Sequence, residues 1–318
     1  MGKYKPVDLN KIKTYSAHER STKVELASFA RPAGKGASFE KFYSSLPHFL
    51  AADSLRGSVE AIAKAYKKKR PVVIGMGAHV IKVGLNPIII DLMKKGIVTC
   101  VALNGAGSIH DFEIATLGRT SEDVAEGLET GMFGMVEETM RDMNQAIRGS
   151  GDQEAGNQDI SGSGMGQLLG KKLLQTKAPH QNLSIMATGA KLGTPVTVHV
   201  AIGTDTIHMS PHVDAEALGK ASFTDFRLLC SVLGDLEGGV YLNLGSAVLL
   251  PEVFLKALTV ARNLGNKIKN FTTINMDMIQ HYRPRQNVLS RPGSQAFALT
   301  GHHEIMLPLL YQAVIEKL

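Results

Sequence analysis

The sequence predicts an α/β fold: a Rossmann-like, mostly parallel sheet with helices on both faces. At least five short apolar segments alternate with helical patterns along the chain, which is typical of βαβ units. The segments are nearly all apolar, as expected for strands that helices cover on both faces. Four of them end in Gly, Ser, Thr, Asn or Asp. Ligands of such folds bind beyond the carboxyl ends of the strands, so we expect the functional site at that edge.

Composition and charge describe an ordinary soluble protein. The chain has 318 residues, of which 44% are hydrophobic. No apolar run reaches the ~20 residues that span a bilayer, and the polar first residues do not resemble a secretory signal. With two cysteines and no disulfide framework, we expect a cytoplasmic protein without a membrane partner. The net charge of +6 comes without a zinc-finger or helix-turn-helix pattern, so we expect no nucleic-acid partner.

Residues 1–37 show no strong periodicity and are expected to form an N-terminal arm. We expect residues 38–318 to form a single Rossmann-like domain. Its first half should contain helices within 38–67, a strand at 71–74, a helix at 85–95, a strand at 97–103 and helices from near Asp111 and at 132–147. Residues 149–166 are rich in Gly, Ser, Asp and Gln, which predicts a flexible insertion. The same composition would also suit a linker between two domains.

The second half continues the alternation. We expect helices at 184–192, 214–233, 252–264 and 300–317, and strands at 194–200, 239–244 and 271–275. Residues 280–295 contain several arginines and histidines and two prolines, and we expect them to be irregular. The glycine turn at Gly75-Met76-Gly77 is not the usual dinucleotide fingerprint, because the third glycine and the later acidic residue are missing.

Histidines gather where the predicted strands end. Eight of the eleven lie there or in the irregular segment: His79, His110, His199, His208, His212, His281, His302 and His303. Carboxylates accompany them, including Asp111, Glu113, Asp205, Glu252 and Asp277. A histidine beside a carboxylate suits acid–base catalysis near neutral pH. A metal site is an alternative, although Pro211 opposes the helix that would align His208 with His212.

The order of these motifs resembles the deoxyhypusine synthase family from about residue 70 to the C-terminus. The segments that carry the resemblance are GAHVIKVGLNPIIIDLMKKGIVTCVALNGAGSIHD, GTPVTVHVAIGTDTIHM, GGVYLNLGSAVLLPEVFLKAL, FTTINMDMIQHY and ALTGHHEIMLPLL. The resemblance implies an NAD-binding Rossmann-like subunit that assembles as a homotetramer. It also implies chemistry in which NAD oxidises spermidine and a lysine carries the aminobutyl group as an imine.

The resemblance places the cofactor on the turns after the strands. The implied NAD-binding residues are Gly77, His79, Gly84, Asn104, Gly105, Gly107, Gly245, Ser246 and Thr273. The catalytic positions depart from the family pattern. His302 stands where the family has its lysine, Ile109 and His110 stand where it has two glutamates, and His208 stands where it has an aspartate. Its histidine falls near Glu252.

We therefore expect an NAD-binding enzyme of altered chemistry that acts on an amine or a related small molecule. His110, His208 and His302 are the expected acid–base residues, and Asp111 and Asp205 are expected to orient them. Glu252, Asp277, Arg283 and Arg285 are expected to contact the substrate, because arginines bind carboxylates and phosphates well. Two alternatives remain open: the family's aminobutyl transfer with another lysine, such as Lys82, and a non-catalytic nucleotide-binding protein.

Overall fold

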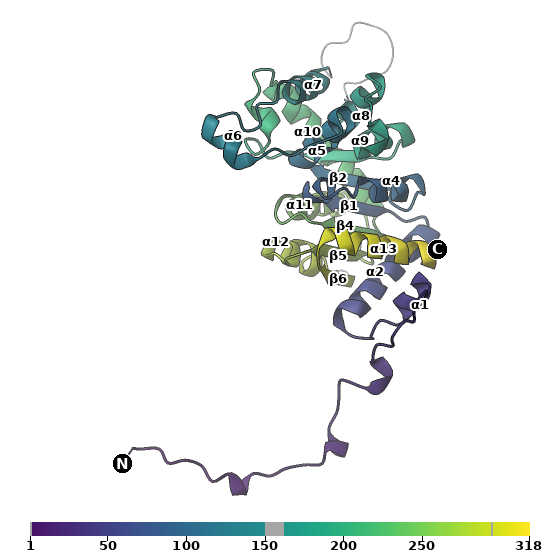
Figure 1. The fold of residues 1–318 in the computed structure, drawn as a ribbon, viewed down its shortest axis with the longest axis vertical. Helices are drawn as coiled ribbons and strands as arrows, with labels where there is room; N and C mark the ends of the chain where they lie inside the picture. The colour runs from purple at the N-terminus through teal and green to yellow at the C-terminus, as the bar shows by residue number, and fades with distance from the viewer. Residues whose placement is uncertain (1, 150–161, 294) are drawn as a thin grey trace. The chain divides into compact units, whose positions relative to one another are not determined.

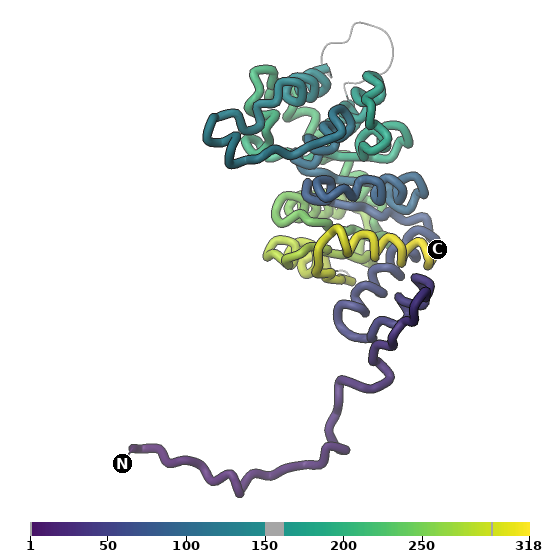
Figure 2. The backbone as a smooth tube through the Cα atoms, viewed as in Figure 1, coloured from purple at the N-terminus to yellow at the C-terminus, as the bar shows by residue number. Residues whose placement is uncertain are grey.

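The computed structural model describes residues 2–149, 162–293 and 295–318. By its internal contacts the chain divides into two units, Met1–Phe49 and Leu50–Leu318. The first unit contains three short 3₁₀ turns (Leu9–Lys11, Ala17–Glu19 and Leu26–Ser28) and helix α1 (Phe39–Ser44). The side chain of Ser38 begins α1 by accepting a hydrogen bond from the N–H of Lys41 at 3.2 Å. Figure 2 traces the backbone through both units.

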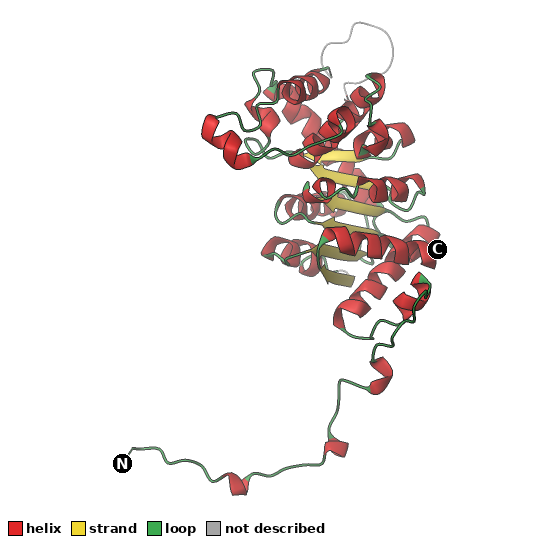
Figure 3. Cartoon of the chain, viewed as in Figure 1, coloured by secondary structure: helices red, strands yellow, loops and turns green. Residues whose placement is uncertain are grey.

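The second unit is built on a six-stranded sheet in which every strand is parallel to its neighbours (Figure 3). The strands are β1 (Val72–Met76), β2 (Cys100–Asn104), β3 (Val196–His199), β4 (Val240–Leu244), β5 (Thr272–Asp277) and β6 (Gln295–Thr300). Their order is β3-β2-β1-β4-β5-β6. This order reverses between β1 and β4, which is the switch point where doubly wound folds form a ligand crevice. The predicted Rossmann-like fold is confirmed.

Helices cover both faces of this sheet (Figure 1). Helices α10 (Ala215–Gly234) and α11 (Leu249–Asn263) pack on each other and on the sheet, and α2 (Leu50–Lys67) packs on α13 (His303–Lys317). The other helices are α3 (His79–Lys82), α4 (Asn86–Lys94), α5 (Gly105–Leu117), α6 (Val124–Thr130), α7 (Glu137–Arg148), α8 (Met165–Gln175) and α9 (Ile185–Leu192). No helix among the described residues is long and apolar enough to cross a membrane.

The core between the sheet and α10–α11 explains why the strands are so apolar. Every residue of β1, β3, β4 and β5 is buried. The rings of Tyr241 on β4 and Phe254 on α11 stack with their centroids 3.8 Å apart. Each large buried side chain of this kind contributes about 2 kcal/mol to stability by leaving water. Strands buried on both faces cannot alternate with polar residues, so their sequences read as continuous apolar runs.

Helix α5 begins earlier than the sequence pattern indicated. It starts at Gly105 rather than near Asp111, because the Asn104 side chain accepts a hydrogen bond from the N–H of Gly107 at 2.8 Å. An asparagine cap of this kind satisfies one of the free N–H groups of the first turn. The helix ends at Gly118, whose φ of 69° is left-handed. The turn after β2 is therefore also the N-terminus of a helix.

The prediction that residues 280–295 are irregular was wrong. They contain a short helical turn, α12 (Tyr282–Pro284), a π-helical segment at Arg285–Ser290, and the start of β6. Strand β6 was missed altogether. The final helix begins at His303 rather than at residue 300. The flexible insertion expected at 149–166 falls mostly on residues 150–161, which lie outside the described residues.

Candidate functional site

The carboxyl edge of the sheet brings the turns after β1 and β4 into direct contact. The N–H of Gly77 donates to the carbonyl of Leu244 at 3.0 Å. A Cβ atom at Gly77 would lie 2.3 Å from the carbonyl oxygen of Gly245, so no larger residue fits there. Gly245 itself is left-handed, with a φ of 64°. The close backbone contact at this switch point therefore requires small residues, independently of any ligand that they bind.

A buried histidine lies beside this contact. His303, the first residue of α13, is 1% exposed, and its Nε2 atom is 3.8 Å from Oδ1 of Asp277. Its ring lies 5.9 Å from that of His79, and its Nδ1 atom makes no hydrogen bond within the described residues. Burial lowers the pKa of His303, which favours the neutral ring. His79 and Asp277, both expected site residues, thus both lie beside His303.

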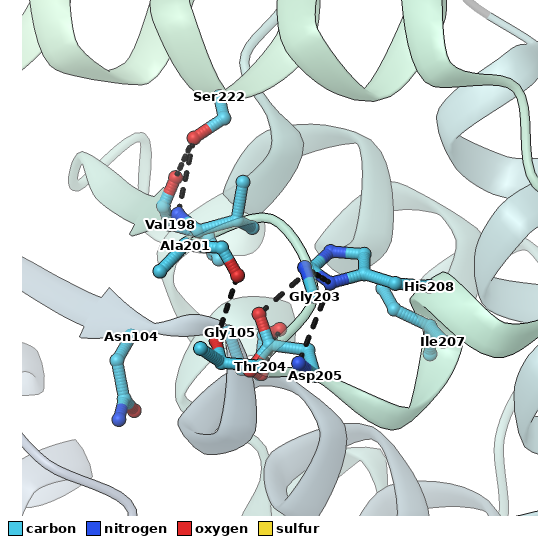
Figure 4. Close-up of polar contacts among 12 residues, drawn as sticks. Asn104, Gly105, Val198, Ala201, Gly203, Thr204, Asp205, Ile207, His208 and Ser222 are labelled. Carbon is cyan, nitrogen blue, oxygen red and sulfur yellow. Dashed lines mark hydrogen bonds and ion pairs between the residues drawn. The ribbon is translucent and has the colours of Figure 1, made fainter.

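Asp205 and His208 form a second buried pair, beyond the ends of β2 and β3 (Figure 4). The Nδ1 atom of His208 accepts hydrogen bonds from the N–H groups of Gly203 at 3.1 Å and Asp205 at 3.3 Å. An accepting Nδ1 places the proton of the neutral ring on Nε2, which lies 3.8 Å from Oδ2 of Asp205. Neither of these two facing atoms makes a hydrogen bond within the described residues.

Burial shifts both members of this pair toward their neutral forms. It raises the pKa of Asp205 to about 6, although a hydrogen bond from the N–H of Ala106 opposes the shift. It also lowers the pKa of His208. Gly105 is required by the pair, because a Cβ atom there would lie 1.9 Å from Oδ2 of Asp205. Asp205, one of the two carboxylates expected to orient the site histidines, thus lies beside His208.

A cavity of about 590 Å³ opens beside Asp205, a size that suits a small ligand. Its wall includes a hydrogen-bonded chain of three side chains. Thr120 donates to Oε2 of Glu113 at 2.5 Å, and its Oγ1 lies 2.6 Å from Nδ1 of His110. Since the hydroxyl proton of Thr120 is given to Glu113, its oxygen accepts the Nδ1–H of His110. The Nε2 atom of His110 is then the unprotonated nitrogen, and it has no hydrogen-bond partner within the described residues.

The charge state of His110 suits a base. Burial, and to a smaller extent the charge of Lys82, lower the pKa of His110 to about 4, so the ring is neutral at pH 7. Thr139 holds the other oxygen of Glu113 at 3.1 Å and so fixes the far end of the chain. The cavity wall also carries charges of both signs: Lys82, Arg119, Glu122 and Asp205.

Asp111 lies elsewhere than we expected. Its carboxylate is fully buried and accepts hydrogen bonds from Ser184 at 2.6 Å, from the N–H groups of Ile185 and Met186 at 2.8 and 3.1 Å, and from Asn86 at 3.0 Å. These donors belong mainly to the first turn of α9. Asp111 therefore holds α9 against α5. We had expected it to orient a site histidine, but its hydrogen bonds are made to α9 and Asn86 instead.

The residues that we expected to contact the substrate lie in two separate places. Glu252 pairs with Arg283 and Lys256 and accepts from Asn287 at 2.8 Å. The hydrogen bond from Lys256, with those from Arg283 and Asn287, lowers the pKa of Glu252 to about 2. Glu252 and Arg283 thus satisfy each other at the surface, and Arg285 is exposed. Only Asp277 of this group lies beside a buried site histidine.

The structure places Thr273 and His302 away from the positions that we had expected. Thr273 is the second residue of β5 and pairs in register with Tyr241, so it lies toward the amino end of the strand and not at the cofactor turns. The side chain of His302 is 65% exposed and lies 4.0 Å from Glu304, whereas its neighbour His303 is buried in the site. The hydroxyl of Ser246 accepts a hydrogen bond from the N–H of Leu250, in the first turn of α11, at 3.1 Å. Gly84, with a φ of 77°, has open space beside it.

From the sequence we assigned no site role to Thr120, Thr139 or His303, although we counted His303 among the histidines near the strand ends. Glu113 carried a signal, because it follows His110 by three residues on one helix and so shares its face. Thr120 and Thr139 carried none, since they reach Glu113 from beyond α5. Among the described residues, no group of three or more His, Cys, Asp or Glu side chains is placed to hold a metal ion.

No protein-family model matches the sequence, and no curated protein matches it. Solved structures do match. A conserved candidate LOR/SDH protein from Methanococcus maripaludis S2 is 18% identical with a TM-score of 0.51, over 90% of this chain and 74% of that one. AgrE in a ternary complex with ornithine and NAD⁺ is 15% identical with a TM-score of 0.53, over 85% and 34%. A candidate deoxyhypusine synthase from Entamoeba histolytica is 14% identical with a TM-score of 0.53, over 89% and 94%.

These similarities establish a shared fold. Proteins with this fold include one crystallised with NAD⁺ and one with a deoxyhypusine synthase description, so the predicted resemblance holds at the level of the fold. The chain matches almost the full length of the Entamoeba protein but spans only about a third of AgrE. Activity and substrate must be argued from the site itself.

Proposed function

We propose that the chain is an NAD-binding enzyme that acts on a small molecule carrying an amine. One observation supports this most strongly. Four buried polar atoms at the carboxyl edge, on both sides of the switch point, make no hydrogen bond within the described residues: Oδ2 of Asp205, Nε2 of His208, Oδ1 of Asn243 and Nδ1 of His303. Buried polar atoms without partners are costly, so this edge is suited to a polar ligand that supplies them.

The residues at this edge fit a dinucleotide. Gly77, His79 and Gly84 follow β1. Asn104 ends β2, and Gly105 and Gly107 lie in the first turn of α5. Gly245 and Ser246 follow β4. The turns after β2 and β4 lead into α5 and α11, and helix N-termini favour phosphate. When bound, NAD accepts or supplies a hydride. Asp277, His79 and His303 would line one part of the crevice, and Asp205 and His208 another.

The cavity beside Asp205 is where we place the substrate. His110 would take a proton at Nε2, while Thr120 and Glu113 keep its ring in one tautomer and orientation. Glu122 and Asp205 would attract an amine, and Lys82 and Arg119 would attract an anionic group on the same molecule. Ornithine, which AgrE holds together with NAD⁺, is a molecule with this combination of charges.

Cofactor binding can be tested on the purified protein. We expect mass spectrometry of co-purifying small molecules to find NAD, and calorimetry to show saturable binding of NAD⁺. His79→Ala should weaken NAD⁺ binding at least about fivefold, since it removes a polar contact of the ~1 kcal/mol kind. Lys220→Ala, on the exposed surface of α10, is the control and should change nothing. The proposal fails if neither NAD⁺ nor NADH binds at millimolar concentration.

A second candidate is aminobutyl transfer through Lys82, because its amine lines the same cavity as His110. After NAD⁺ takes a hydride from spermidine, the lysine amine would displace 1,3-diaminopropane from the resulting imine and so carry the aminobutyl group as an imine of its own. Borohydride reduction in the presence of NAD⁺ and spermidine should then add the aminobutyl group to Lys82, and peptide mass spectrometry would locate it. If Lys82 stays unmodified under conditions where NAD⁺ binds, aminobutyl transfer through Lys82 is ruled out, and only the first candidate function remains.

A further inference from the structure

A second and larger cavity lies at the opposite, amino-terminal edge of the sheet. Its volume is about 920 Å³. It is formed by the end of α2, the residues that lead into β4 and β5, and the end of α13. None of the residues of the candidate site described above takes part in it. Its size is in the range of small-molecule sites.

The wall of this cavity is strongly basic. Six cationic side chains line it, against the two carboxylates Glu60 and Glu237: Lys64, Lys67, Lys68, Arg70, Lys269 and Lys317. The formal surplus is four positive charges, six minus two, while the whole chain has a net charge of +6. Most of the protein's net charge is thus gathered around one hollow.

The two carboxylates are already engaged. Glu60 pairs with Lys317 at 2.5 Å. Glu237 accepts hydrogen bonds from the N–H groups of Lys269 and Asn270 at 2.6 and 2.9 Å and from the Asn270 side chain at 2.8 Å. These hydrogen bonds lower the pKa of Glu237, so it stays ionised while it shapes the loop before β5.

Several of the cations have no such partner. Within the described residues, Lys64, Lys68 and Lys269 form no ion pair. Like charges around one cavity repel each other, and an anion bound between them would relieve that repulsion. The uncompensated positive charge of this cluster therefore favours the binding of a negatively charged ligand.

Helix stabilisation explains only part of the cluster. Lys64 and Lys67 lie in the last turn of α2, where cations offset the negative end of the helix dipole. Lys269 belongs to a loop before β5, and Lys317 to the last turn of α13. Elements far apart in the sequence thus place lysines around the same cavity. The dipole of α2 does not account for Lys269 or Lys317.

We propose that this cavity binds a small molecule with two or more phosphate groups. Lysines bind phosphates as point charges, and several of them around one hollow match an anion of high charge. A nucleic-acid strand fits less well, because single strands are bound on exposed aromatic rings. Phe271, the aromatic residue of this wall, is only 4% exposed.

The test uses the full chain and inorganic tripolyphosphate in calorimetry at near-physiological salt. We expect saturable binding with one site per chain. The double variant Lys64→Gln/Lys269→Gln should bind at least about tenfold more weakly, since it removes two charge-assisted contacts. Lys171→Gln/Lys172→Gln, which changes the net charge equally on α8, should bind like the parent. Thermal unfolding of each variant shows that it is folded.

Three results would overturn the proposal. The first is no saturable binding of tripolyphosphate at millimolar concentration. The second is equal weakening by both double variants, which would show that net charge alone attracts the anion. The third is a short RNA strand that binds more tightly than tripolyphosphate and through the same two lysines. NAD⁺ titrations of the same variants keep this test separate from the proposed function, because NAD⁺ binding at the other edge should not change.

Discussion

At the scale of single residues, His110 shows how neighbours determine what a side chain can do. Its Nδ1–H is given to Thr120, which in turn donates to Glu113. The tautomer is thereby fixed, and burial keeps the ring neutral by lowering its pKa to about 4. The ring is therefore unprotonated throughout the physiological pH range, with Nε2 as its acceptor atom.

We predict that His110→Gln lowers turnover about 10²- to 10⁴-fold, the usual contribution of a general base. Because the base works unprotonated and its pKa is about 4, protonation of His110 should not lower the activity between pH 7 and 5, whereas protonation of Asp205, whose pKa is about 6, should lower it there by weakening the attraction for the amine. Steady-state rates across this range check this, once a substrate is found. Thr120→Val should lose part of the activity, because the orientation and tautomer of the ring are then no longer fixed.

The control is NAD⁺ binding, which both variants should retain. Unchanged turnover in His110→Gln would refute the assignment of His110. An acidic limb near pH 6.5, the ordinary pKa of histidine, that persists in Asp205→Asn would show that the ring of His110 is not shielded as its burial indicates.

How much of the site could be predicted depended on where each residue lies in the chain. His110 and Asp205 follow predicted strands, so the rule about carboxyl ends found them. His302 and His303 are neighbours, and the sequence could not show which one faces inward. In the structure His302 is the N-cap residue of α13, and the side chain of His303 lies beside Asp277. Thr120 reaches Glu113 only because α5 ends at Gly118, a tertiary consequence that no local pattern contains.

At the scale of elements, Asp225 joins α10 to α8 and β3. Its carboxylate accepts hydrogen bonds from the N–H groups of Gly166 at 3.0 Å and Val198 at 2.7 Å. Gly164 is required beside it, because a Cβ atom there would lie 1.8 Å from Oδ1 of Asp225. Burial raises the pKa of Asp225 to about 7, although these hydrogen bonds oppose the shift.

The raised pKa of Asp225 predicts how the stability of the folded protein changes with pH. The folded state binds a proton at Asp225 below about pH 7, whereas the unfolded state does so only near its ordinary value of 3.8. The contribution of Asp225 is therefore most favourable at low pH and is lost as the pH rises through 7. Relative to Asp225→Asn, the parent should gain about 2–3 kcal/mol between pH 8 and pH 5, at about 1.4 kcal/mol per pKa unit.

Urea unfolding of both proteins at several pH values measures this difference, and the comparison cancels the other titrating groups. Asp53→Asn, at an exposed position on α2, is the control and should show no such trend. A difference between Asp225→Asn and the parent that does not change with pH would mean that Asp225 remains ionised in the folded protein.

Elements were predictable where packing on both faces makes the sequence apolar. The central strands β1, β2 and β4 were found for this reason. Strand β6 was missed because it is at the edge of the sheet and most of its side chains are exposed, so Gln295–Thr300 has no continuous apolar run. The π-helical segment at Arg285–Ser290 has no simple residue signature either.

At the scale of the whole molecule, the two edges of the sheet have different characters. The amino-terminal edge carries the basic cavity, and the carboxyl edge carries the candidate site together with exposed apolar side chains. Four of these follow three adjacent strands and are more than half exposed: Val248 after β4, Ile279 and Tyr282 after β5, and Ile305 after β6. Large apolar side chains that gather on a surface are typical of protein interfaces.

We propose that these residues bind a second copy of the chain, as the homotetramer implied by the family resemblance would require. Light scattering at micromolar concentration should then give a multiple of the chain mass. The variant Ile279→Asp/Tyr282→Asp should lower that mass, because placing two charges in an apolar interface costs several kcal/mol. It should also weaken NAD⁺ binding if the partner covers the crevice, since Ile279 lies two residues beyond Asp277. Phe223→Asp, at an exposed apolar position on α10, is the control and should keep the assembly. A parent protein with the mass of one chain would contradict the proposal.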